Sequence, residues 1–472
     1  MKLYRFFYSF LIGVVCSLTA VAQTRVACIG NSITFGSRLK DRLTEAYPAQ
    51  LQNMLGPGLK VMNFGVSGAT LLKNGNKPYT ATPAWKEALS SAPDVVFIKL
   101  GTNDSKLVNR KFYTEFKSDY KEMIRDLRQL PSKPRIILLT PIATFTTDTA
   151  QIWDVALTRS VLPLIWEVAY DEGLELLDLH SLFLDKENLL PDKIHPDAAG
   201  AKVIADRLYA HLMLKRAPAD LKKKLKEPFT LSSFYGYKNM EFQFKGRKAF
   251  IVEPKFAAPG HPWIWRARFW GHEPQTDIAL LERGYHVAYC DASEWFGNQE
   301  AIDLWNAFYG YLQGMGLSRK VVLEGMSRGA VYVYNWAALN PKKVACVYAD
   351  NPVLDLKSWP GGLGKGPGSK TDWEIFKKDY GFNTDESARA SKVSPIDQID
   401  LIVKGHYPVL HVCGDADEVV PMEENTIPFE KMFKQKGGSI TVLHKKEGKH
   451  HPHSLPNPEP IVRFILQANS SK

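Results

Sequence analysis

Residues 321–330 read Val321-Val322-Leu323-Glu324-Gly325-Met326-Ser327-Arg328-Gly329-Ala330. The β-branched beginning predicts a strand, and the apolar residues after Gly329 predict a helix. Between them lies the pattern Gly-x-Ser-x-Gly, whose two glycines allow the tight strand-to-helix turn that exposes a serine. The stretch therefore predicts an α/β sheet with Ser327 as a candidate nucleophile.

Strands and helices alternate around this turn throughout the second half of the chain. A hairpin over 240–252 with Gly246 at its turn comes first, and the alternating segments after it imply a complete α/β domain. The expected strands are 263–269, 285–290, 321–324, 344–348, 409–412 and 440–443. The expected helices are 276–283, 299–313, 331–339, 423–434 and 459–467.

The first half of the chain shows the same alternation. Its expected strands are 25–29, 60–64, 94–100 and 135–139, and its helix-like segments are 39–55, 112–130 and 197–214. This order implies a parallel sheet with helices on both faces. The charge run Lys222–Lys226 is better solvated than buried, so we assign 215–230 as a basic linker between an α/β domain at 23–214 and a second at 231–472.

The composition is that of a folded protein. Of the 472 residues, 45% are hydrophobic and 23% are charged, which excludes a disordered or low-complexity chain. The formal net charge of +10 would attract an acidic partner such as nucleic acid or an acidic polysaccharide. Because the basic residues are scattered and no nucleic-acid-binding motif is present, we expect no nucleic-acid partner.

Residues 1–22 have the pattern of a signal peptide. Lys2 and Arg5 precede an apolar stretch over 6–15, and Ala20-Val21-Ala22 supplies the small residues of a cleavage site. The apolar stretch is shorter than the ~20 residues of a spanning helix, and Val15 disfavours lipidation of Cys16. We expect a periplasmic or secreted protein without a membrane span.

The sequence gives no indication of a metal or cofactor. Cys28, Cys290, Cys346 and Cys413 lie in apolar runs that predict buried strand positions, and no Cys or Cys/His pair has zinc spacing. The glycine-rich segment 361–370 lacks the Gly-Lys-Ser/Thr of a phosphate-binding loop, and we expect it to be a mobile loop near the active site.

Four short motifs in the first half fit one chemistry. They are Gly30-Asn31-Ser32-Ile33-Thr34, Asn63-Phe64-Gly65-Val66-Ser67-Gly68, Gly101-Thr102-Asn103-Asp104 and Asp192-Lys193-Ile194-His195-Pro196. Three of them follow expected strands, where α/β folds keep their sites. Each motif alone has a structural explanation, such as a helix cap or a turn, and only the ordered set indicates catalysis.

At these residues the sequence resembles the SGNH (GDSL-like) hydrolases over about residues 25–212. The resemblance implies that Ser32 attacks an ester carbonyl, that His195 is its general base, and that Asp192 orients His195. It also implies an oxyanion hole formed by Gly68, Asn103 and the Ser32 N–H. Asn31 stands where many members of the family have Asp.

Further motifs follow Ser327 in the order Ser, Asp, His. They are Gly414-Asp415-Ala416-Asp417 and Lys449-His450-His451-Pro452-His453. With the Gly-x-Ser-x-Gly turn they resemble the α/β-hydrolase superfamily over 235–470. The resemblance favours Asp417 as the acid, with Asp415 as the alternative, and His450 as the base, with His451 and His453 as alternatives.

The same resemblance implies an oxyanion hole beside Ser327. Its first donor is the Arg328 N–H, and the second lies within 266–272. Alternation along an extended segment would point Arg266 and Arg268 the same way, so that they could bind carboxylates of an acidic substrate. The structural alternative pairs one arginine with Glu324. The neighbouring tryptophans fit either sugar binding or core packing.

Together the resemblances imply two α/β domains, an SGNH-type α/β/α domain followed by an α/β-hydrolase fold, as in bacterial glycan esterases. We expect an exported two-site carbohydrate esterase that needs no cofactor. The first half is expected to be a sugar O-acetylesterase and the second an acyl or methyl esterase, with a uronate methyl ester as one target. Two alternatives stay open: a prolyl-oligopeptidase-like peptidase in the C-terminal half, or a non-catalytic glycan-binding module in one half.

Overall fold

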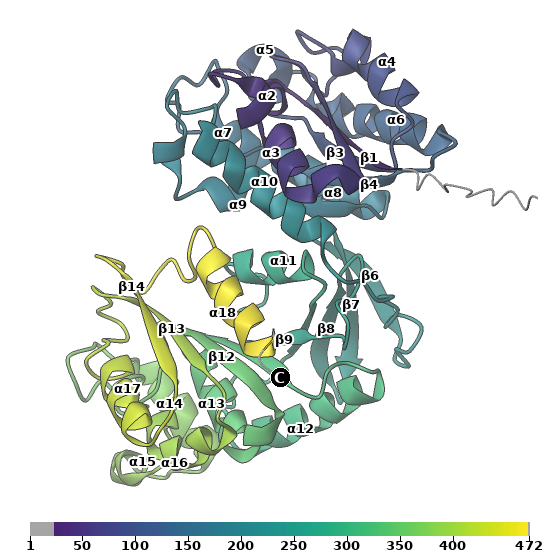
Figure 1. Cartoon of the computed structure of the whole chain (residues 1–472). Helices are drawn as coiled ribbons and strands as arrows, with labels where there is room; N and C mark the ends of the chain where they lie inside the picture. The colour runs from purple at the N-terminus through teal and green to yellow at the C-terminus, as the bar shows by residue number, and fades with distance from the viewer. Residues whose placement is uncertain (1–22, 471–472) are drawn as a thin grey trace, which may run out of the picture.

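The computed structural model describes residues 23–470 and contains two α/β domains (Figure 1). The N-terminal domain runs from purple to teal in the figure, and the C-terminal domain from teal to yellow. The expected fold class is confirmed. The signal peptide expected at 1–22 lies outside the described residues and stays a prediction. Within 23–470, no helix is both long enough and apolar enough to cross a membrane.

The N-terminal domain is built on a five-stranded parallel sheet of order β2-β1-β3-β4-β5. The strands are β1 (Thr24–Gly30), β2 (Leu59–Gly65), β3 (Val95–Lys99), β4 (Arg135–Leu139) and β5 (Glu175–Leu177). Successive side chains of β1 enter separate cores on the two faces of the sheet. Helices α3 (Tyr47–Leu55) and α10 (Ala198–Leu212) cover one face; α4 (Pro83–Ser90), α6 (Phe116–Gln129) and α8 (Leu162–Asp171) cover the other.

One expected helix of this domain is broken in two. The segment 39–55 forms α2 (Arg42–Glu45) and α3, with Ala46 extended between them. Pro48 lies in the first turn of α3, where its missing N–H costs no hydrogen bond, but it could not continue a helix from α2.

The C-terminal domain has a nine-stranded sheet of order β14-β13-β12-β11-β9-β10-β8-β7-β6. Strands β6 to β8 form an antiparallel meander, and the sheet is parallel from β10 to β14. The strands are β6 (Phe229–Phe234), β7 (Tyr237–Phe244), β8 (Arg247–Glu253), β9 (Trp263–Ala267), β10 (His286–Cys290), β11 (Val321–Met326), β12 (Val344–Asp350), β13 (Val409–Gly414) and β14 (Ile440–Lys445). The four cysteines outside 1–22 lie buried in strands of the two sheets, as expected.

Helices cover both faces of this sheet as well. Helices α12 (Gln299–Gly314), α13 (Gly329–Leu339) and α17 (Thr426–Gln435) pack on one face, and α11 (Gln275–Leu281) and α18 (Glu459–Ser470) on the other. The sequence analysis did not predict α14 (Lys370–Tyr380), although its buried Trp373 and Phe376 have helical spacing.

The segment 215–230 packs along the C-terminal domain. Ala217 pairs with Ala257, and Leu221 is buried in the core of that domain. The charged side chains of Lys222 and Lys223 remain exposed, as expected for this run. The last two residues of the segment already belong to β6. The connection is therefore a packed strap rather than a free tether.

The two domains meet through buried polar contacts. Arg207 of α10 forms an ion pair with Glu282, which follows α11, and their side chains are 6% and 2% exposed. A second oxygen of Glu282 accepts the N–H of Asp178 at 2.5 Å. The Tyr237 hydroxyl donates to the carbonyl of Leu176 across the same boundary.

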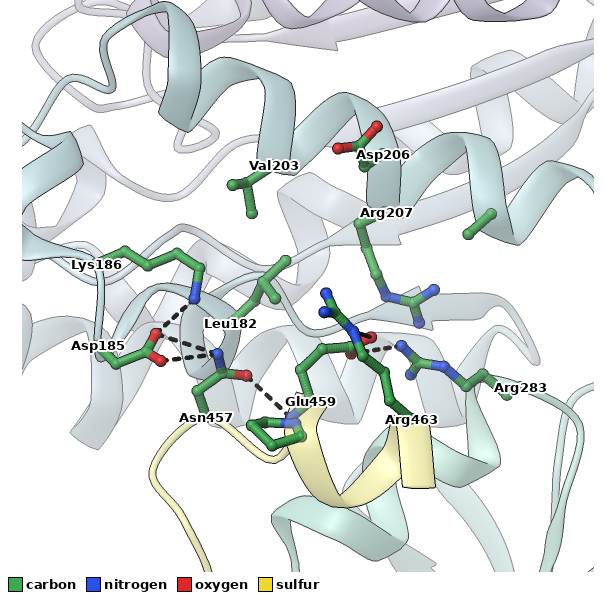
Figure 2. A pocket seen from close by; sticks show the side chains of 12 residues that line it. Leu182, Asp185, Lys186, Val203, Asp206, Arg207, Arg283, Asn457, Glu459 and Arg463 are labelled. Carbon is green, nitrogen blue, oxygen red and sulfur yellow. Dashed lines mark hydrogen bonds and ion pairs between the residues drawn. The ribbon is translucent and has the colours of Figure 1, made fainter. Parts of the chain in front are cut away.

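A cavity of about 450 Å³ lies beside this ion pair, between α10 and the beginning of α18. Figure 2 shows its charged lining, with Arg283 bonded to Glu459 and Asn457 bonded to Asp185 of the N-terminal domain. The Asn457–Asp185 contact adds a further bond between the domains. Together these contacts indicate a fixed relation between the two sheets.

Candidate active sites

Ser32, His195 and Asp192 meet at the carboxyl edge of the first sheet. His195 Nε2 lies 2.9 Å from Ser32 Oγ, and His195 Nδ1 lies 2.8 Å from Asp192 Oδ2. The other Asp192 oxygen accepts the backbone N–H of His195 at 2.7 Å. Partial burial opposes ionisation of Asp192, but the donors from His195 outweigh it and lower the pKa of Asp192. The three side chains have the connectivity of a Ser-His-Asp triad.

The turn after β1 presents Ser32. Ser32 is the first residue of the short helix α1 (Ser32–Phe35), and the Asn31 side chain caps that helix by accepting the Ile33 N–H at 3.1 Å. Asn31 therefore fills a capping role for which either Asn or Asp is suited.

Gly68 and Asn103 lie with Ser32 and His195 around a cavity of about 680 Å³. Gly68 has a φ of +79°, a left-handed conformation that glycine adopts without strain. One N–H of the Asn103 amide donates to the carbonyl of Ala69 at 3.0 Å, which orients the amide. The structure thus gathers all five residues that the resemblance assigned to this site.

Asp104 is a site residue that sequence reasoning missed. Its carboxylate accepts the N–H groups of Leu71 and Leu72 at 3.0 and 2.9 Å, and thereby ties the Asn103 loop to the segment that follows Gly68. Burial raises the pKa of Asp104 to about 6. The position of Asp104 directly after Asn103 was the one indication in the sequence that Asp104 belongs to the site. The sequence could not show that the Asn103 loop contacts the segment after Gly68.

Ser327 stands on a tight turn between β11 and α13, with a φ of +50°. A Cβ on Gly325 would lie 2.9 Å from Ala330, and one on Gly329 would lie 2.7 Å from the carbonyl of Ala267. Larger residues would not fit at either position. The two glycines therefore permit the strained serine conformation that the motif predicts.

The second triad is complete. Ser327 Oγ lies 3.0 Å from His450 Nε2, and His450 Nδ1 lies 2.7 Å from Asp417 Oδ2. The other Asp417 oxygen accepts the N–H groups of Val419 and Val420, both at 2.9 Å. The alternative acid, Asp415, is bonded instead to His444.

Comparisons with known proteins agree with this division. The sequence model of the GDSL-like Lipase/Acylhydrolase family matches residues 28–203, and that of the Prolyl oligopeptidase family matches residues 297–465. The chain joins a GDSL-like hydrolase domain to an α/β-hydrolase domain of the prolyl oligopeptidase type. Ser32 and His195 lie within the first match, and Ser327, Asp417 and His450 within the second.

One curated relative is similar in sequence to part of this chain. An acetylxylan esterase of Xylanibacter ruminicola is 44% identical over 204 residues, which cover 39% of this chain and 42% of the relative. The chain therefore matches less than half of that relative's length.

Solved structures resemble each domain at low identity. A carbohydrate acetylesterase family member from Sinorhizobium meliloti covers 40% of this chain and 97% of its own, with 19% identity and a TM-score of 0.34. An acylaminoacyl peptidase of Pyrococcus horikoshii covers 53% of this chain and 42% of its own, with 16% identity and a TM-score of 0.38.

Arg266 of the α/β-hydrolase domain does not lie where a substrate could reach it, which corrects the expectation from the sequence. Its side chain is 1% exposed and bonds Asp277 at 2.5 Å and Glu324 at 3.1 Å. Burial, more than any neighbouring charge, raises the pKa of Glu324 well above its usual range. Arg266 thus belongs to an internal ion cluster, which was the structural alternative.

Arg268 does not belong to the extended strand that contains Arg266. Strand β9 ends at Ala267, and the positive φ of Arg268, +59°, turns the chain out of the extended conformation. The alternation that would have aligned the two arginines therefore fails. The Arg268 side chain is 10% exposed and bonds Glu294 and the Tyr332 hydroxyl. The expected acidic-substrate clamp is not formed by this pair.

The tryptophans of β9 are core residues rather than a sugar platform. Trp263 and Trp265 are fully buried, and Trp265 stacks on Trp305 with ring centroids 4.2 Å apart.

The side chain of Arg328, whose N–H is the expected oxyanion donor, bonds Asp372 at 2.5 Å.

Asn351 is a second missed residue. Its side chain donates to the carbonyl of His450 at 2.8 Å and accepts the N–H of Gly414 at 2.7 Å, so it links the loop of the base to the end of β13. Asn351 follows the carboxyl end of β12, which was the signal available in the sequence.

We expect Arg266→Ala to destabilise the α/β-hydrolase domain by about 3–5 kcal/mol, because it leaves two buried carboxyl groups without their cation. The free energy of unfolding can be measured by denaturant titration of the full chain, followed by tryptophan fluorescence. Arg268→Ala is the control, and its partly exposed ion pair should contribute no more than about 1 kcal/mol. Equal losses for the two variants would contradict the internal ion cluster.

Proposed function

We propose that this chain is a two-site serine hydrolase of glycan esters. The observation that carries the proposal is the pair of Ser-His-Asp arrangements, each with both hydrogen bonds at 2.7–3.0 Å. Each arrangement lies in a domain whose family is a family of hydrolases.

At the first site the geometry supports acyl transfer through Ser32. His195 Nε2 accepts the hydroxyl proton as Ser32 Oγ attacks the ester carbonyl carbon. The N–H groups of Ser32 and Gly68 and the Asn103 amide stabilise the resulting oxyanion. When the intermediate collapses, the bond to the sugar oxygen breaks and His195 protonates that oxygen, so that the sugar leaves as an alcohol. Water then attacks the acyl-enzyme with His195 again as the base, which releases the acid.

An acetylated glycan is the substrate that we propose for Ser32. The cavity at this serine has polar groups on several sides, among them Ser37, Arg38, Lys106 and Gln151, which suit a hydroxyl-rich sugar. The relative named acetylxylan esterase supports an acetyl ester on a xylan-type chain.

For the second site we propose an acyl or alkyl ester of a glycan, cleaved through Ser327 by the same steps with His450 and Asp417. The second candidate is a peptide bond, which the match to the Prolyl oligopeptidase family favours. Against it, the two sheets described within 23–470 include no propeller. Arg266 is internal and Arg268 is bonded to Glu294, so neither arginine supports an acidic glycan as the substrate.

Substrate profiles of the full chain test both assignments. The Ser327→Ala variant should release acetate from acetylated xylo-oligosaccharides. The Ser32→Ala variant should hydrolyse other glycan esters and leave peptide p-nitroanilides intact. Cleavage of the anilides by Ser32→Ala at rates above those on every ester would establish the peptidase alternative for the second site.

A further inference from the structure

Three histidines beside the second triad form a cluster that the proposed mechanism does not use. His272 follows β9, whereas His451 and His453 follow β14, directly after the base. One ring nitrogen from each histidine lies within 4.8 Å of the other two. Both ring nitrogens of His450 are bonded within the triad, so the cluster is separate from the catalytic base.

The buried member of the cluster is oriented by a carboxylate. His453 is 3% exposed, and its Nδ1 lies 2.8 Å from Asp350 Oδ1. The other Asp350 oxygen accepts the Ser454 N–H at 2.9 Å. Because Nδ1 bonds Asp350, Nε2 of His453 is the nitrogen available to a metal ion. Histidines that ligate metals commonly donate their second N–H to a carboxylate in this way.

The backbone of His272 is fixed by the internal ion cluster. Its carbonyl accepts a hydrogen bond from the Arg266 guanidinium, and its N–H donates to the carbonyl of Phe269 at 3.1 Å. The rings of His272 and His451 are exposed. They can therefore turn to bring the nitrogens from 4.8 Å to the separation of about 3.3 Å that tetrahedral Zn–N bonds of about 2.05 Å require.

We propose that His272, His451 and His453 form a binding site for one divalent transition metal ion of the zinc type. Neutral imidazoles suit zinc and its neighbours, whereas magnesium and calcium prefer oxygen ligands. Three protein ligands leave a fourth position for water or a substrate oxygen. His272 is far in sequence from the other two ligands, so the spacing of residues could not reveal this site.

The test is metal binding by the purified full chain. After equilibrium dialysis against Zn²⁺, the wild type is expected to retain one tight equivalent. His272→Ala and His451→Ala, both at exposed positions, should bind at least about 100-fold more weakly, since each removes one of three ligands. Co²⁺ in place of Zn²⁺ should give the intense visible absorption of a tetrahedral ion in the wild type, but not in His272→Ala or His451→Ala.

Two control variants show whether a loss of Zn²⁺ binding is specific to the three-histidine cluster. His444→Ala removes an exposed histidine of the same domain, bonded to Asp415, and should bind Zn²⁺ like the wild type. Ser327→Ala should also bind Zn²⁺ normally, so the result does not depend on the proposed hydrolase activity. Unchanged binding in His272→Ala and His451→Ala, or an octahedral Co²⁺ spectrum, would overturn the proposal. Binding of an inorganic anion such as phosphate that these two variants abolish, without Zn²⁺ binding, would assign the cluster to anions instead.

Discussion

Replacing Ser32 with alanine in the full chain is expected to lower kcat/KM for acetate release by about 10⁴-fold or more. The reason is that Ser32 Oγ is the hydroxyl placed 2.9 Å from His195 Nε2, so its loss removes the covalent step. The same substitution should leave hydrolysis at Ser327 unchanged, because that serine has its own base and acid. Ser327→Ala should show the converse pattern. Both variants can be compared with the wild type on an acetylated and on a non-acetylated glycan ester.

The matched control for Ser32 is Ser90→Ala, which removes an exposed hydroxyl of the same domain at the end of α4, outside the cavity that contains Ser32. It should retain most of the acetate release. If the Ser327→Ala variant alone abolished hydrolysis of every ester, the first site would be inactive and the two-site proposal would be wrong.

Asp417→Asn is expected to reduce kcat at the second site by about 10⁴-fold with little change in fold. The amide would still fill the space beside His450 Nδ1. However, it could not stabilise the imidazolium that forms during attack, and it would favour the wrong tautomer of His450. The loss should appear in kcat rather than in KM, because Asp417 is 6% exposed and bonded to the base. Steady-state kinetics of the Ser32→Ala background with and without Asp417→Asn measure this effect.

Asp415→Asn provides the comparison within the same loop. Asp415 carries the same charge two residues away, but it bonds the exposed His444. We expect a less than about tenfold change in kcat for this variant. A loss as large as that of Asp417→Asn would show that the assignment of the acid is wrong.

The sequence predicted the two sheets and the residues that form both Ser-His-Asp arrangements, because these depend on local patterns in a fixed order. Ser327 lies between two glycines that form a recognisable motif, and Asp417 and His450 follow in the order of the fold. The contacts that hold these residues were not predictable in the same way. Asp104 and Asn351 act across loops that are distant in sequence, and nothing local shows which loops meet.

Arg266 illustrates the opposite error. An arginine near a nucleophile suggested recognition of an anion, because a sequence shows the charge but not its burial. Its partners Asp277 and Glu324 come from α11 and β11, and only the packing of α11 against the sheet brings them together. Alternation failed at Arg268 for a related reason, since the strand ends at Ala267, two residues earlier than the pattern predicted.

The packed strap and the buried Arg207–Glu282 pair fix the distance between Ser32 and Ser327. Two enzymes on a flexible tether would sample a range of distances. A polymer bound to one enzyme would then reach the other at an effective concentration set by the length of the tether. Under the proposed function, a rigid pair can cleave during one encounter only those ester groups whose spacing along a glycan matches the distance between the serines. A polymer with irregularly placed esters must instead dissociate and rebind between cleavages.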